Sequence, residues 1–181
     1  MKDKQDQGLQ DSLGERTVLV IDDSEAVRTA LDVLLSMHGA RVLGAGSAAA
    51  GIGVLAGESV DLVIQDMNFR REATSGEEGI ALFHQIRAQH PDLPVILLTA
   101  WTHLETAVEL VKAGASDYVA KPWDNARLLT TVRNLLDLQA ARAENRAIRH
   151  RLFFGYNSQR LLANPQVAVV IVVPNVAKLE E

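Results

Sequence analysis

The feature that most constrains the fold of this chain is a regular alternation of short apolar runs with segments of helical spacing. The apolar runs have strand length and several are rich in β-branched residues, which is typical of buried strands. We predict strands at Thr17–Ile21, Arg41–Ala45, Asp61–Gln65, Pro94–Leu98 and Asp117–Ala120.

The segments between these runs place apolar residues three and four positions apart, as an amphipathic helix does. A strand followed by a helix, five times over, predicts an α/β fold with a five-stranded parallel sheet and helices on both faces. Right-handed crossovers favour the doubly wound, open form of this sheet. Ligands of such sheets bind beyond the carboxyl ends of the strands.

Polar side chains stand at the carboxyl ends of four predicted strands. Asp22 and Asp23 follow the first strand, and Asp66 follows the third. Thr99 follows the fourth strand and Lys121 the fifth. Three carboxylates close together repel each other unless a cation lies among them, and Mg²⁺ favours oxygen ligands. Because a lysine also suits a phosphoryl oxygen, we predict a Mg²⁺-assisted phosphoryl site with a carboxylate nucleophile.

Four blocks of sequence resemble the signature blocks of response-regulator receiver domains of bacterial two-component systems: VLVIDDSEAVR, DLVIQD, PVILLTAWTHLETAVELVKAGASDY and VAKPW. The resemblance covers residues 16–138. The long loop after Asp66, MNFRREATSGEEG, is similar to that of receivers in nitrogen-regulatory-type enhancer-binding activators. The resemblance implies a flavodoxin-like sheet with strand order 2-1-3-4-5 and an extended C-terminal helix.

The resemblance also implies a role for each residue of the site. Asp66 would accept a phosphoryl group from a sensor histidine kinase, and Thr99 and Lys121 would contact that group. Thr99 and Tyr118 would form a switch that changes a dimer or partner surface. The implied Mg²⁺ ligands are Asp22, Asp23, Asp66 and the backbone carbonyl of Asn68. Such a domain is a signalling module rather than an enzyme, with only self-phosphorylation and slow self-dephosphorylation.

Two other functions fit parts of the same pattern. A dimerisation or scaffold module would keep the fold without accepting phosphate, although the intact acidic triad argues against it. A phosphotransferase of the haloacid-dehalogenase type would carry a second aspartate two residues after its nucleophile, where this chain has Asn68.

The sequence outside residues 16–138 predicts three further segments. Residues 1–15 are interpreted as a flexible lead-in. The last helix is predicted to continue to about Leu152, with residues 139–152 as a helical linker or short coiled coil. Residues 153–181 are unassigned and fit either a truncated next domain or a segment foreign to the family. The expected seam of a homodimer consists of Leu138, Ala141, Asn145, Ile148 and Leu152.

Composition narrows the expected partners and location. A net charge of -5 argues weakly against direct nucleic-acid binding, so control of transcription would act on DNA only through an effector domain not visible in this chain. The absence of cysteine excludes disulfides and thiolate catalysis. Neither a signal peptide nor an apolar run long enough to span a bilayer is evident, so we expect a cytoplasmic domain without a membrane partner.

Overall fold

A computed structural model describes residues 12–69, 77–100 and 104–163, although the side chains of 104–107 and 149–163 fall outside the description. The chain forms two compact units, Met1–Ala141 and Arg142–Glu181. The first unit contains the sheet and all residues of the predicted phosphoryl site.

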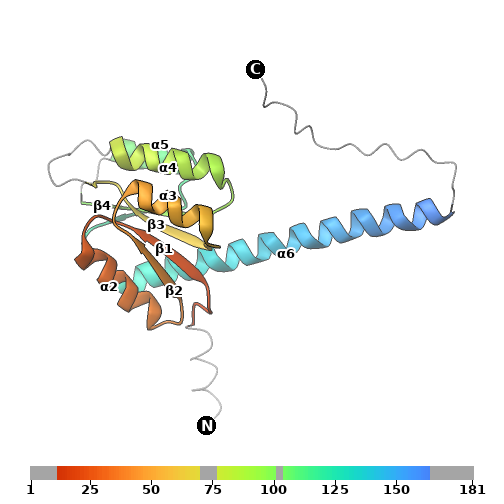
Figure 1. The fold of residues 1–181 in the computed structure, drawn as a ribbon, viewed down its shortest axis with the longest axis horizontal. Helices are drawn as coiled ribbons and strands as arrows, with labels where there is room; N and C mark the ends of the chain where they lie inside the picture. Colours follow the sequence, from red (N-terminus) through yellow and green to blue (C-terminus); the bar gives the residue numbers. More distant parts are fainter. Residues whose placement is uncertain (1–11, 70–76, 101–103, 164–181) are drawn as a thin grey trace, which may run out of the picture. The chain divides into compact units, whose positions relative to one another are not determined.

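Five parallel strands form one sheet in the order β2-β1-β3-β4-β5 (Figure 1). The predicted doubly wound fold and its strand order are therefore confirmed. Strands β3 and β4 begin one residue later than predicted. Strand β4 begins after Pro94 because proline has no N–H for the ladder. Before β3, the side chain of Asp61 accepts a hydrogen bond from the backbone N–H of Thr17. The strands are β1 Thr17–Ile21, β2 Arg41–Ala45, β3 Leu62–Asp66, β4 Val95–Thr99 and β5 Asp117–Ala120.

Helices cover both faces of the sheet, as predicted (Figure 1). Helices α3, α4 and α5 pack on one face, and α2 with the first part of α6 packs on the other. Alternate residues of each strand serve the two layers, so Leu19 and Ile21 face α3 and α4 while Val18 and Val20 face α2 and α6. The helices are α2 Glu25–Ser36, α3 Ala48–Gly57, α4 Glu77–Gln89, α5 Leu104–Lys112 and α6 Asn125–Ala163.

The two ends of the fold differ from the predicted boundaries. Leu13 is buried and its backbone N–H donates to the carbonyl of His38, so packing begins inside the range interpreted as a lead-in. Helix α6 ends at Ala163 rather than near Leu152. Its sequence lacks proline, whereas Pro165 disfavours helical backbone at the residue before it. Residues 164–181 of the unassigned tail lie outside the described residues.

None of the helices in the described ranges combines the length and apolar character that a membrane span requires. The finding agrees with the hydropathy of the sequence, whose apolar runs are all short.

Arg87 ties the end of α4 to two loops of the sheet. Its Nη1 donates to the carbonyl oxygens of Pro91 at 2.7 Å and His90 at 3.3 Å, and its Nη2 donates to that of Gly114 at 3.0 Å. The guanidinium also lies over the Phe83 ring, 5.6 Å from its centroid. A planar fork with several donors can reach three carbonyl groups at once, which a single ammonium cannot.

We therefore expect Arg87→Lys to lower the free energy of unfolding by about 2 kcal/mol, because a single ammonium cannot donate to all three carbonyl groups and lacks the planar guanidinium that covers the Phe83 ring. Urea denaturation would measure the change. Arg41→Lys is the matched control, since the Arg41–Glu58 ion pair is 56% and 45% exposed. We expect the control to change the free energy by less than about 0.5 kcal/mol. Equal effects of the two substitutions would contradict the role given to Arg87.

Candidate functional site

The carboxyl ends of four strands bring the predicted site residues to one edge of the sheet. Asp22 directly follows β1, and Lys121 directly follows β5. Asp66 and Thr99 are the last residues of the adjacent strands β3 and β4. Asp22, Asp66 and Thr99 are buried, with exposed fractions of 1%, 3% and 2%. Apolar strands thus end in polar groups that the core holds in fixed positions.

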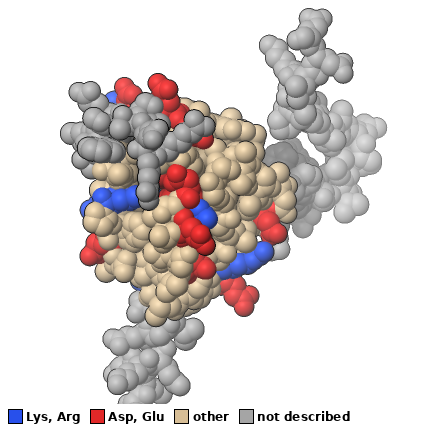
Figure 2. Space-filling view, turned by 60° about the vertical axis from the view of Figure 1, so that its left-hand side comes forward, with Lys and Arg blue, Asp and Glu red and all other residues tan. Residues whose placement is uncertain are grey.

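Three of these side chains form an acidic cluster. Carboxylate oxygens of Asp22, Asp23 and Asp66 all lie within 4.8 Å of one another. Asp23 is exposed whereas the other two are buried. Acidic side chains adjoin basic ones on the side of the molecule seen in Figure 2. Because this spacing lets one cation contact all three carboxylates, the donor set fits a hard divalent ion such as Mg²⁺.

Lys121 bridges the two buried carboxylates. Its Nζ lies 2.6 Å from Oδ2 of Asp22 and 3.0 Å from Oδ1 of Asp66. The second contact is an ion pair without hydrogen-bond geometry, and no described donor makes a hydrogen bond to this buried Oδ1. Three carboxylates against one ammonium leave the cluster with two uncompensated negative charges. This excess of negative charge favours the binding of a cation.

The environment of Asp66 disfavours its charged form. Burial raises the pKa of the Asp66 carboxyl, and the charge of Asp22 adds to this effect. Lys121 and the backbone N–H of Asn68 act in the opposite direction without reversing it. A cation in the cluster would favour the ionised form that a nucleophile needs.

The sequence did not reveal the part played by Arg28 on α2. Its Nη1 donates to the backbone carbonyl oxygens of Asp22 at 2.6 Å and Asp23 at 3.1 Å. Oδ1 of Asp22 in turn accepts from the backbone N–H of Ser24 at 2.8 Å. These bonds fix the turn that presents both carboxylates. The available signal was an arginine shortly after an acidic pair, and its carbonyl partners are not visible in a sequence.

The predicted switch residues Thr99 and Tyr118 lie on the paired strands β4 and β5. Tyr118 on β5 is half-buried and packs against the core on the α4 side. The peptide bond between Lys121 and Pro122 is cis, and the Lys121 N–H donates to the carbonyl of Thr99 at 2.6 Å. The switch roles of Thr99 and Tyr118 and the ligand role of the Asn68 carbonyl stay predictions. Residues 70–76 and 101–103 lie outside the description.

The predicted dimer seam lies on α6. Leu138 and Ile148 are each 47% exposed, and Ala141 and Asn145 are also exposed. The side chain of Leu152 lies outside the described residues. Exposed leucine and isoleucine agree with a helix that has a partner, but the seam itself stays a prediction.

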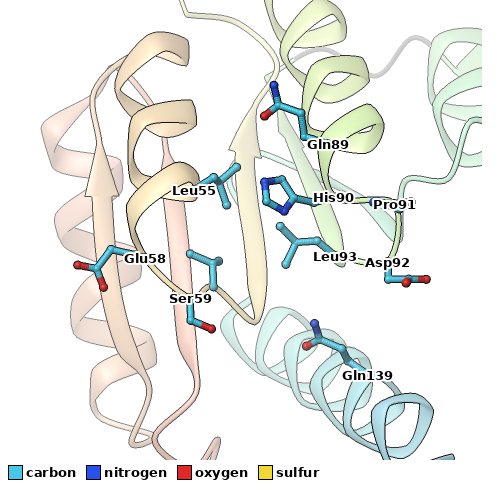
Figure 3. Close-up of a pocket in the computed structure, with 10 residues that line it drawn as sticks. Leu55, Glu58, Ser59, Gln89, His90, Pro91, Asp92, Leu93 and Gln139 are labelled. Atoms are coloured by element: carbon cyan, nitrogen blue, oxygen red, sulfur yellow. The ribbon is translucent and has the colours of Figure 1, made fainter. Parts of the chain in front are cut away.

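A hollow of about 420 Å³ lies at the opposite edge of the sheet, where β3 and β4 begin. Figure 3 shows Leu55, His90 and Leu93 close together and Gln139 approaching from α6. It lies away from the acidic cluster and contains none of the predicted site residues.

Known proteins resemble this chain in sequence and in fold. The sequence profile of the response regulator receiver domain matches residues 18–133. The C4-dicarboxylate transport transcriptional regulatory protein DctD of Rhizobium meliloti is 33% identical over 133 residues, which are 74% of this chain and 28% of DctD. The response regulator protein FleR of Pseudomonas aeruginosa is 39% identical over 115 residues, which are 64% of this chain and 23% of FleR. The chain thus spans about a quarter of the length of these two relatives.

Solved structures have the same fold. A receiver domain protein from Clostridium thermocellum is 28% identical with a TM-score of 0.62, and the match covers 70% of this chain and 98% of that protein. NtrX from Brucella abortus is 28% identical with a TM-score of 0.67, and the match covers 75% of this chain and 29% of NtrX.

The raised pKa of Asp66 predicts how stability depends on pH. Folded Asp66 keeps its proton to a higher pH than an ordinary carboxyl group, whose pKa is 3.8. As the pH rises from that value through the folded pKa, the unfolded state loses its proton first, so the folded state becomes less stable. The cost is absent at pH values below the ordinary carboxyl pKa and is fully present above the folded pKa of Asp66.

We therefore expect Asp66→Asn to raise the free energy of unfolding at pH 7 by roughly 1–2 kcal/mol, because Lys121 keeps Asp22 as its partner. The gain should vanish as the pH falls toward 3.8, the ordinary carboxyl value. Chemical denaturation at several pH values would measure it. Asp137→Asn on the exposed surface of α6 is the control. A loss of stability at pH 7 in Asp66→Asn would contradict the prediction.

Proposed function

The chain belongs to the response regulator receiver domain family, and from this premise we propose that it is a phosphorylation-controlled switch with Asp66 as the phospho-acceptor. One observation carries the proposal, namely the contact of Lys121 with Asp22 and Asp66 beside the exposed Asp23. Carboxylates that can share a cation, next to an ammonium, are suited to stabilise a phosphoryl group in transfer.

In the proposed reaction a carboxylate oxygen of Asp66 attacks the phosphorus of a phosphohistidine on a sensor histidine kinase. The new P–O bond forms as the P–N bond breaks, and the bonding pair of electrons leaves with the histidine nitrogen. Lys121 then transfers its ion pair from Asp66 to a phosphoryl oxygen. Mg²⁺ held by Asp22, Asp23, Asp66 and the Asn68 carbonyl would supply positive charge to the phosphoryl oxygens.

Phosphorylation adds negative charge and acceptor oxygens at a buried site. The hydroxyl of Thr99 stands at the end of the neighbouring strand, where a phosphoryl oxygen can attract it. A movement of Thr99 would leave room for Tyr118, so that phosphorylation shifts the population between two packings of this edge. The output is a changed dimer or partner surface.

We propose that this module works in the cytoplasm as part of a longer regulator. DctD is by its name a transcriptional regulatory protein, and this chain resembles about a quarter of it. Control of DNA would then come from an effector domain, with the phosphorylated module acting on it as a homodimer.

The first test is phosphorylation by acetyl phosphate with and without Mg²⁺, followed on a phosphate-affinity gel. We expect a Mg²⁺-dependent shifted band that Asp66→Ala abolishes, because the nucleophilic carboxylate is gone. Asp137→Ala, on the exposed surface of α6, should keep the band. A band that survives in Asp66→Ala would identify a different nucleophile. No band with either acetyl phosphate or a phosphorylated histidine kinase would favour a scaffold function.

The dimer has a test of its own within the second unit. Ile148→Glu places a charge on the exposed seam position and should shift the phosphorylated protein toward monomer in sedimentation velocity. Ala143→Glu adds the same charge on an exposed residue outside the seam and should leave the association unchanged. Equal behaviour of the two variants would rule out this seam.

A further inference from the structure

Gly79, in the first turn of α4, lies against the backbone of Met67, the residue directly after Asp66. A Cβ at position 79 would stand 2.5 Å from the carbonyl oxygen of Met67, 2.6 Å from its Cα and 2.8 Å from its carbonyl carbon. Backbone atoms cannot rotate away as a flexible side chain can. Helix α4 therefore reaches this position only because residue 79 has no side chain.

Gln65, the residue directly before Asp66, bonds to the same glycine. Its side chain is fully buried, and its Nε2 donates to the carbonyl of Gly79 at 2.6 Å. Its Oε1 is also buried, and no described donor reaches it. A buried amide with one unpaired oxygen is costly in an otherwise apolar layer. The hydrogen bond to Gly79 gives a reason for an amide at this position.

We propose that Gln65 and Gly79 are positioning residues for the cation site, an inference that rests on the proposed function. Together they form a latch that holds the start of α4 against the backbone of Met67. The N–H of Met67 donates to the carbonyl of Leu98 at 2.9 Å, so this backbone is held from both sides. The next carbonyl along the chain is that of Asn68, the proposed Mg²⁺ ligand.

The contacts of the latch lie close in the chain to Phe69 and Glu77, the described residues on either side of positions 70–76. Phe69 is buried in the same layer as Met67, and Glu77 begins α4. The latch therefore holds the backbone beside the Asn68 carbonyl through contacts that lie wholly within the described residues. Mg²⁺ demands near-octahedral geometry, which makes a fixed carbonyl valuable.

The test compares two glycine-to-alanine substitutions in helices. Alanine is favoured over glycine in a helix, so Gly79→Ala and Gly53→Ala share this gain in helix propensity. The Cβ of Gly53→Ala meets no described neighbour within 4 Å, whereas that of Gly79→Ala must displace Met67. We expect the Mg²⁺ dissociation constant, measured by isothermal titration calorimetry, to rise about tenfold in Gly79→Ala and to stay within about twofold in Gly53→Ala.

Gln65→Met keeps the side-chain length, removes the donor and should raise the Mg²⁺ dissociation constant in the same direction. If circular dichroism shows that Gly79→Ala does not fold, Gln65→Met alone tests whether the latch positions the cation site. Parent protein that binds Mg²⁺ while both variants bind it equally well would overturn the latch and leave the proposed function intact. Reduced thermal stability with an unchanged dissociation constant would overturn it too. A parent that binds no Mg²⁺ would overturn both proposals.

Discussion

The contact of one ammonium with two buried carboxylates is the interaction on which the site depends. Lys121 arrives from β5, two strands away from Asp66 on β3, and reaches across the end of β4. Asp22 comes from β1, on the other side of β3. Without the ammonium, two carboxylates would be buried with no opposite charge, which the packing energy of a small domain could hardly offset. The order of the strands therefore places the ammonium where its charge offsets the cost of burying both carboxylates.

The same cluster is unfavourable for folding and suited to chemistry. Burial and Asp22 raise the pKa of Asp66, so the native state bears a cost at neutral pH that a surface aspartate would avoid. A bound cation would offset that cost and favour the ionised carboxylate that the proposed attack on phosphorus requires. A destabilising charged group at a well-packed edge of the sheet is expected of a functional site rather than of an ion pair that only stabilises the fold.

Much of the fold was predictable because the burial pattern of a parallel sheet is visible in the sequence. Strands buried on both faces appear as continuous apolar runs, and polar residues at their ends stand out against them. That contrast located Asp22, Asp66, Thr99 and Lys121, while their individual roles came only from the resemblance to receivers. The end of α6 was missed because its last turns lack a clear apolar stripe. Arg28, Gln65 and Gly79 were missed because their partners are backbone atoms.

Arg28, Gln65 and Gly79 all act on the part of the site that β1 and β3 form. Arg28 holds the carbonyls of Asp22 and Asp23 from the α2 side of the sheet, and Gln65 with Gly79 holds Met67 from the α4 side. The part built on β1 and β3 is thus anchored on both faces. From β5, the backbone N–H of Lys121 donates to the carbonyl of Thr99, and its Nζ contacts the carboxylates of Asp22 and Asp66. A metal site needs fixed ligands and a switch needs a movable element. The anchors on β1 and β3 suit the proposed cation site, and the proposed response to phosphate begins at Thr99 on β4.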